Sequence, residues 1–130
     1  MVGGLPGSLG VITVIAAAFF GAISGSNTAT VAAIGGIMIP AMIKEKYPKD
    51  YACAVAAAAG TLGVVIPPSV PMIVYAVISG VSIGTLFIAG IVPGVLMALA
   101  LIITNIVIGK RYKLIRNKIS LKELLESFVE

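Results

Sequence analysis

The chain has 130 residues, of which 59% are hydrophobic and only 11% are charged, and its mean hydropathy is +1.14. Soluble domains are about 45–50% apolar and about 25% charged, so this composition excludes an ordinary soluble fold. The sequence contains no histidine and a single cysteine. It therefore excludes disulfide frameworks, zinc clusters and acid–base catalysis by histidine.

The 14 charged residues fall in two groups that flank long apolar stretches. Residues 44–50 contain five of them and residues 110–130 contain nine, whereas residues 1–43 and 51–109 contain none. This placement is typical of an integral membrane protein, because a bilayer tolerates charges only at its edges. Basic residues that directly follow an apolar span usually report orientation in the membrane, so we expect a lipid-embedded protein with no nucleic-acid partner.

The first apolar stretch is interrupted at its middle by the polar run Ser24-Gly25-Ser26-Asn27-Thr28. The flanking helices of about 16 residues would each extend roughly 24 Å, which is short of a hydrocarbon core about 30 Å thick. A re-entrant helical hairpin over residues 8–43, whose tip stops inside the protein, fits these lengths better than two short spans. Two short spans joined by an exposed turn remain the alternative.

The second apolar stretch, residues 50–80, predicts one discontinuous helix. Its first half, Ala52 to Ala59, consists mostly of small residues suited to close helix packing. Pro67 and Pro68 lack N–H groups and disfavour helix in the residues before them. We therefore expect the helix to stop near Gly63 and to restart around Pro68.

Two further segments complete the predicted all-α, polytopic fold. Residues 83–109 are long enough to span the membrane with some tilt, and a kink is expected at Pro93-Gly94. Residues 110–130 are predicted to form a cytoplasmic tail that ends in an amphipathic helix beginning with a capping box at Ser120. The resulting topology places both basic groups on one face, which the positive-inside rule assigns to the cytoplasm. Two short spans in place of the hairpin would give the same result.

The predicted membrane interior contains no Asp, Glu, Lys, Arg or His, so proton coupling within this segment is not expected. Ser69 has no base to activate it, and we predict no enzymatic activity. The two interruptions instead expose backbone groups: carbonyl oxygens that suit a hard monovalent cation, and N–H donors that suit an anionic substrate group. An ion or substrate site is therefore predicted at residues 24–28 and 63–69. Close packing alone is the alternative explanation for the small residues in Gly21-x-x-x-Gly25 and Gly90-x-x-x-Gly94.

Three motifs in order resemble those of one transporter family; they begin at Gly21 (GAISGSNTATVAAIG), Gly60 (GTLGVVIPPSVPM) and Phe87 (FIAGIVPG). They are similar to the large membrane subunit, the DctM type, of tripartite ATP-independent periplasmic (TRAP) transporters. The resemblance implies an elevator-type permease of the bacterial inner membrane that couples sodium entry to uptake of organic acids such as C4-dicarboxylates or sialic acid. It also implies two partners, a periplasmic solute-binding protein that delivers the substrate and a small four-helix membrane subunit.

The resemblance further implies which residues hold sodium, the coupling ion; no other cofactor is expected. The family's side-chain ligands fall on Ser24 and Asn27, and its carbonyl ligands fall on Gly63, Ile66 and Pro67. Asn27 stands where the family more commonly has serine, although an amide oxygen can also coordinate sodium. The substrate is expected to contact the adjoining residues, which are Gly25, Ser26, Thr28, Pro68 and Ser69.

The family's large subunit is much longer than this chain, which resembles part of its N-terminal half. The resemblance therefore places the second hairpin, the second sodium site and much of the substrate site in a remainder of the permease. Two alternatives are a sodium/proton antiporter-like relative of similar fold and a non-transporting truncated membrane scaffold. The absence of carboxylates from the membrane interior argues against the antiporter.

Overall fold

A computed structural model describes residues 7–111, and all regular secondary structure in this range is helical. The amphipathic helix predicted around Ser120 lies outside the described residues. Three segments are long and apolar enough to cross a membrane: Asn27–Lys44, Lys49–Ser79 and Ile83–Lys110. The prediction of an all-α, polytopic membrane protein is therefore confirmed. The helices are α1 (Ser8–Ser24), α2 (Asn27–Lys44), α3 (Lys49–Gly60), α4 (Leu62–Val65), α5 (Val70–Ser79) and α6 (Ile83–Arg111).

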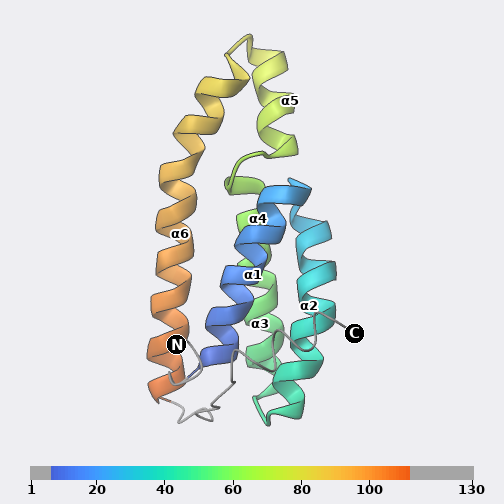
Figure 1. The fold of residues 1–130 in the computed structure, drawn as a ribbon, viewed down its shortest axis with the longest axis vertical. Helices are drawn as coiled ribbons and strands as arrows, with labels where there is room; N and C mark the ends of the chain where they lie inside the picture. Colours follow the sequence, from blue (N-terminus) through green and yellow to red (C-terminus); the bar gives the residue numbers. More distant parts are fainter. Residues whose placement is uncertain (1–6, 112–130) are drawn as a thin grey trace, which may run out of the picture.

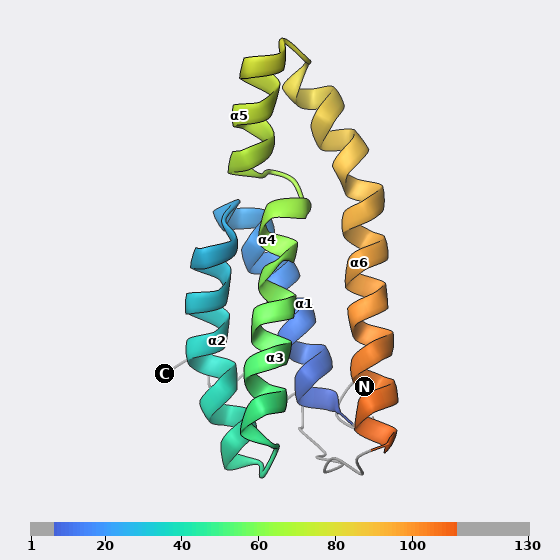
Figure 2. The same cartoon turned by 180° about the vertical axis from the view of Figure 1, so that it is seen from behind.

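The described part of the chain is elongated, and its helices run roughly along the long axis (Figure 1). α1 and α2 form an antiparallel hairpin that occupies the lower part of this length, with α3 packed beside both helices (Figure 1). α5 continues beyond the hairpin, and α6 returns along the whole length past α5 and α1 (Figure 2). The hairpin tip therefore lies level with the interruption between α4 and α5.

The first group of charged residues and the described start of the second lie at the same end of the molecule. Lys44 to Asp50 span the end of α2, the turn and the start of α3. The end of α6, which contains Lys110, lies near the same level (Figures 1 and 2). This arrangement agrees with the predicted topology as far as the end of α6; the rest of the second basic group lies outside the described residues. It follows from one hairpin that returns to its starting end, one ascending broken helix and one descending helix.

The two-residue turn of the hairpin is formed by residues with strong helix-ending and helix-starting preferences. Gly25 adopts a left-handed conformation (φ +62°), and its N–H donates to the Gly21 carbonyl oxygen at 2.8 Å, which closes α1. Ser26 precedes α2 as its N-cap and accepts a hydrogen bond from the Ala29 N–H at 3.5 Å. Because only two residues separate the helices, α1 and α2 must run antiparallel.

The broken helix is interrupted later than predicted. α3 ends at Gly60, but after Thr61 the short α4 carries the helix on to Val65, and α5 begins at Val70. The predicted boundaries near Gly63 and Pro68 were therefore about two residues too early. A proline constrains mainly the residue before it, so Pro67 forces Ile66 into an extended conformation (φ −79°, ψ +123°) while Val65 stays helical.

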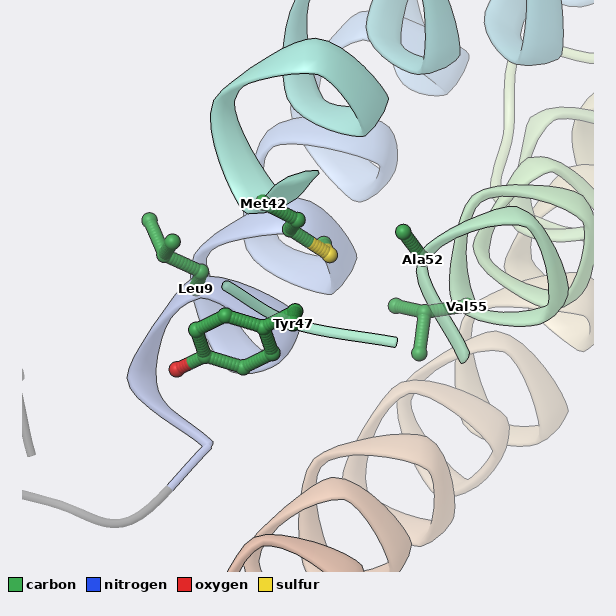
Figure 3. Close-up of a cluster of buried hydrophobic side chains, with 5 residues drawn as sticks. All are labelled: Leu9, Met42, Tyr47, Ala52 and Val55. Carbon is green, nitrogen blue, oxygen red and sulfur yellow. The ribbon is translucent and has the colours of Figure 1, made fainter. Parts of the chain in front are cut away.

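The core consists of two clusters where the hairpin packs against α3. The first lies near the charged end and contains Leu9, Met42, Tyr47, Ala52 and Val55 (Figure 3). The second lies nearer the hairpin tip and contains Val14, Ala17, Ala59 and Leu62. Ala52 and Ala59 are completely buried, which confirms that the small-residue half of the broken helix supports close packing.

By contrast, α5 buries only Ala76, and α6 carries a series of exposed large hydrophobic side chains, including Leu96 and Ile103. Apolar surfaces of this extent are covered by lipid or by further protein in a membrane protein. α6 is continuous through Pro93.

Candidate ion and substrate site

The two interruptions of the fold are in direct backbone contact. The Val70 N–H at the start of α5 donates to the Gly25 carbonyl oxygen at the hairpin tip, at 3.1 Å. A Cβ atom on Gly25 would lie 3.0 Å from the Pro68 carbonyl oxygen, and one on Gly21 would lie 2.7 Å from the Gly63 Cα. The tip (residues 24–28) and the helix break (residues 66–69) thus form one structural unit, although about 40 residues separate them in the sequence.

The Gly90-x-x-x-Gly94 motif of α6 packs against the other side of the helix break. A Cβ atom on Gly90 would approach Met72 Cε at 2.8 Å and Pro67 Cγ at 3.3 Å, and one on Gly94 would lie 3.0 Å from Ile66 Cγ1. Both Gly-x-x-x-Gly motifs are therefore packing motifs, as the alternative interpretation predicted. Both pack against the broken helix, so they also position the backbone of the predicted site.

Prolines determine which carbonyl oxygens at the break lack a helical partner. A helical carbonyl accepts from the N–H four residues later. The partners of the Gly63 and Pro67 carbonyls would be Pro67 and Pro71, which have no N–H. The Ile66 carbonyl would be paired with Val70, whose N–H donates to Gly25 instead.

The Val64 carbonyl also loses its partner, because the residue four positions later is Pro68, but it accepts the Ser69 hydroxyl hydrogen at 2.8 Å. The carbonyls of Gly63, Ile66 and Pro67, which the family resemblance assigns to sodium, are therefore among those without an i+4 donor. The Val65 and Pro68 carbonyls also lack one, because neither the Ser69 N–H nor the Met72 N–H donates to them. Such carbonyl oxygens require another partner, and a cation is one that they can bind.

Hydroxyl groups of the hairpin tip meet the broken helix at Gly63. Ser24 Oγ lies 3.2 Å from Thr30 Oγ1, and the Thr30 hydroxyl donates to the Ser26 carbonyl oxygen at 2.7 Å. A Cβ atom on Gly63 would lie 2.6 Å from Thr30 Oγ1 and 2.8 Å from the Ser26 oxygen. Ser24 and Gly63 are thus brought together through Thr30, which the sequence analysis missed. Its signal was spacing, because Thr30 lies one helical turn after Ser26.

The remaining predicted sodium ligands lie around this contact. Asn27 is half-buried, and its Oδ1 lies 3.0 Å from the position of a Cβ atom on Gly60, at the end of α3. Ile66 and Pro67 pack against α6, as described above. Ser24 and Gly63 are therefore brought together through Thr30, whereas Asn27 lies beside the end of α3 and Ile66 and Pro67 lie against α6.

The predicted substrate residues fall into two places. Gly25, Pro68 and Ser69 line a small hollow of about 130 Å³ between the tip and α5, together with Ile23, Ser24, Val70 and Ile73. Ser26 and Thr28 lie at the other place, the outer side of the tip, where their hydroxyl oxygens are 3.1 Å apart. The hollow is well below the roughly 300–1,000 Å³ of a typical ligand pocket, so these residues supply only part of such a pocket.

The first turn of α5 offers few donors for an anionic group. Its Val70 N–H is bonded to Gly25, its second residue is Pro71, and the Ile73 N–H donates to the Ser69 carbonyl oxygen at 3.1 Å. The Met72 N–H is the first-turn donor outside these bonds. Side chains and other helix ends would therefore have to contribute most of the contacts to an anion.

The family model described as "Tripartite ATP-independent periplasmic transporter, DctM component" matches residues 1–130. The chain belongs to the DctM family of TRAP transporter permeases. It is 54% identical over 101 residues to an isethionate TRAP transporter permease, DctMQ, of Oleidesulfovibrio alaskensis, covering 78% of this chain and 16% of that relative. It is 43% identical to the C4-dicarboxylate permease DctM of Pseudomonas aeruginosa, covering 97% of this chain and 30% of the relative.

A third relative is the sialic acid permease SiaM of Vibrio cholerae, which is 40% identical over 85% of this chain and 26% of the relative. The chain spans less than a third of the length of each of these relatives. The family match shows that the chain is a segment of an inner-membrane transporter permease and not of an enzyme. It also decides against the antiporter-like alternative.

Proposed function

We propose that this segment forms one sodium site of a TRAP permease that imports organic acids, and that it contributes one wall of the substrate site. Three observations support the proposal: the contact between tip and break, the carbonyls without helical donors, and the adjacent hydroxyls of Ser24 and Thr30. The contact carries most weight, because it assembles oxygens from two elements that separately offer too few ligands for a dehydrated cation.

Oxygen chemistry favours sodium as the coupling ion. The donors are neutral carbonyl, hydroxyl and amide oxygens, which suit a hard cation of low charge. Residues 51–109 contain no Asp, Glu, His, Lys or Arg, the residue types that generally carry protons across membranes. Coupling through this segment therefore requires an ion that neutral oxygens can bind.

The hairpin is proposed to be re-entrant. α1 has 17 residues and would extend about 25 Å, whereas α6 has 29 and would extend about 43 Å. Since the tip lies level with the helix break, part-way along α6, it would lie within the membrane when α6 spans it (Figure 1). α2 is itself long and apolar enough to cross, so its length does not distinguish the two arrangements.

The substrates and partners follow from the relatives. Isethionate, C4-dicarboxylates and sialic acid, which name the transporters reported above, are organic anions, so we propose an organic acid as substrate. The remainder of the permease and lipid are proposed to cover the exposed apolar faces of α5 and α6. A small membrane subunit and a periplasmic solute-binding protein are proposed to complete the transporter. Uptake by this complete assembly would distinguish a transporter from the alternative, a non-transporting scaffold.

The test uses the complete permease with its partner proteins in proteoliposomes. Ser24→Ala should raise the sodium concentration for half-maximal uptake about tenfold or more, because it removes one ligand with little change in volume. Ser79→Ala is the matched control: Ser79 also donates to a carbonyl, that of Tyr75 at 2.7 Å, but lies at the exposed end of α5. Equal sodium dependence of the two variants would show that the polar tip serves packing only. Absence of sodium-driven uptake by the unmodified complex would favour the scaffold.

A further inference from the structure

Thr30, a buried threonine beside the proposed sodium ligands, is not itself one of those ligands. Thr30 is completely buried in α2. Its hydroxyl donates to the Ser26 carbonyl oxygen at 2.7 Å. Because a hydroxyl carries one hydrogen, Thr30 Oγ1 can face its other neighbours only as an acceptor.

The neighbour that can use this acceptor is Ser24. Ser24 Oγ lies 3.2 Å from Thr30 Oγ1, and with the Thr30 hydrogen directed to Ser26, the hydrogen in this contact belongs to Ser24. The other acceptor in reach of Ser24 is the Ser26 carbonyl oxygen, at the longer distance of 3.4 Å. That oxygen already accepts the Thr30 hydroxyl and the Thr30 N–H, the latter at 3.1 Å.

Cation binding places a definite demand on the Ser24 hydroxyl. A hydroxyl that coordinates a cation directs a lone pair at the ion, so its hydrogen must point elsewhere and needs an acceptor. Thr30 Oγ1 is such an acceptor, held on the buried side of Ser24. Gly63 packs against the same atom, so the broken helix keeps Thr30 in this place.

We infer that Thr30 is a positioning residue for sodium: it takes the Ser24 hydrogen and thereby leaves one Ser24 lone pair for the ion, while Ser24 Oγ also accepts the Ser26 N–H at 3.4 Å. The inference rests on the proposed sodium site but adds a residue to it. Thr30 acts through Ser24 and not as a sodium ligand. The effect of its hydroxyl should therefore depend on the presence of the Ser24 hydroxyl.

Thr30→Val in the complete permease removes the hydroxyl at nearly constant volume. It should raise the sodium concentration for half-maximal uptake about fivefold to tenfold, as expected for one lost hydrogen bond. The half-saturating substrate concentration measured at saturating sodium should change less than twofold. Thr30→Ser, which keeps the hydroxyl, should restore sodium dependence to within about twofold of the unmodified protein.

Thr13→Val is the matched control, because Thr13 is also completely buried and donates to a main-chain carbonyl, that of Leu9 at 2.7 Å. It should leave sodium dependence unchanged. In a Ser24→Ala background, Thr30→Val should add less than a twofold further change, since the group it positions is gone.

The outcomes separate this inference from the proposed function. If Ser24→Ala has no effect on sodium dependence, the proposed site itself is misplaced. If Ser24→Ala has its effect but Thr30→Val matches Thr13→Val, the positioning role is overturned. Multiplicative effects of Ser24→Ala and Thr30→Val in the double variant would likewise contradict it, because they would show that Thr30 acts independently of Ser24. If Thr30→Val does not accumulate in the membrane, the pair of Thr30→Ser and Thr30→Ala gives the same comparison with smaller changes in shape.

Discussion

Gly63 offers the sharpest test of the contact between the hairpin tip and the broken helix. In Gly63→Ala, the new methyl group would lie 2.6 Å from Thr30 Oγ1 and 2.8 Å from the Ser26 carbonyl oxygen. Ordinary van der Waals contact begins near 3.4 Å, so the two elements would have to separate by about 0.8 Å. One of the two obstacles is main chain, which cannot rotate away. Overpacking of this kind typically costs about 1–3 kcal/mol.

The expected consequence is weaker sodium binding without loss of the fold. A displacement of this size at an ion site should weaken sodium binding about tenfold, which corresponds to about 1.4 kcal/mol. At a sodium concentration 100 times the original dissociation constant, binding stabilises the folded protein by about 2.7 kcal/mol, and a tenfold weaker site reduces this to about 1.4 kcal/mol. The sodium-induced rise in the unfolding temperature of the detergent-solubilised permease should therefore fall by about half.

Gly36→Ala is the matched control for this experiment. Gly36 lies in α2, and a Cβ atom there would have no neighbour within 4 Å. The control should keep the sodium-induced rise in unfolding temperature and gain about 0.5–1 kcal/mol of stability from the helix preference of alanine. If Gly63→Ala showed the same sodium response as Gly36→Ala, the tip and the break would not form a common ion site.

Two further predictions concern single side chains. Asn27→Ser should change the sodium concentration for half-maximal uptake less than about threefold, because a hydroxyl oxygen replaces the amide oxygen. Asn27→Leu should raise this concentration about tenfold or more, because it leaves no oxygen at this position. Similar values for the two variants would argue against Asn27 as a ligand. Tyr51→Phe should lower the free energy of unfolding of the permease in detergent by about 1–3 kcal/mol. The Tyr51 hydroxyl donates to Asn105 Oδ1 at 2.6 Å, and Asn105 is only 4% exposed, so the substitution leaves a buried acceptor without this donor. Tyr75→Phe is the control, since Tyr75 is 61% exposed, and equal unfolding temperatures would contradict the role of this hydrogen bond.

The sequence by itself determined the class of the protein and the position of both interruptions along the chain. Charges confined to residues 44–50 and 110–130 indicated a membrane protein, and the predicted order of hairpin and crossings put both basic groups at one end. The Ser24–Thr28 run and the Pro67-Pro68 pair located the tip and the break, because glycine, serine and proline act on their own backbone. The helix ends were less accurate, since Pro67 stopped the helix at Val65 and not at Gly63.

Only the tertiary structure decided which atoms of the site meet. The prolines act locally: they remove the helical donors of the Gly63 and Pro67 carbonyls and keep Ile66 extended. The bond from the Val70 N–H to the Gly25 carbonyl oxygen, about 45 residues away in sequence, is a tertiary contact. The only sequence signal of Thr30 was its spacing one helical turn after Ser26, whereas its importance comes from the close approach of Gly63. Local patterns determine where a helix breaks, whereas the partners of the exposed backbone groups depend on how closely separate helices pack.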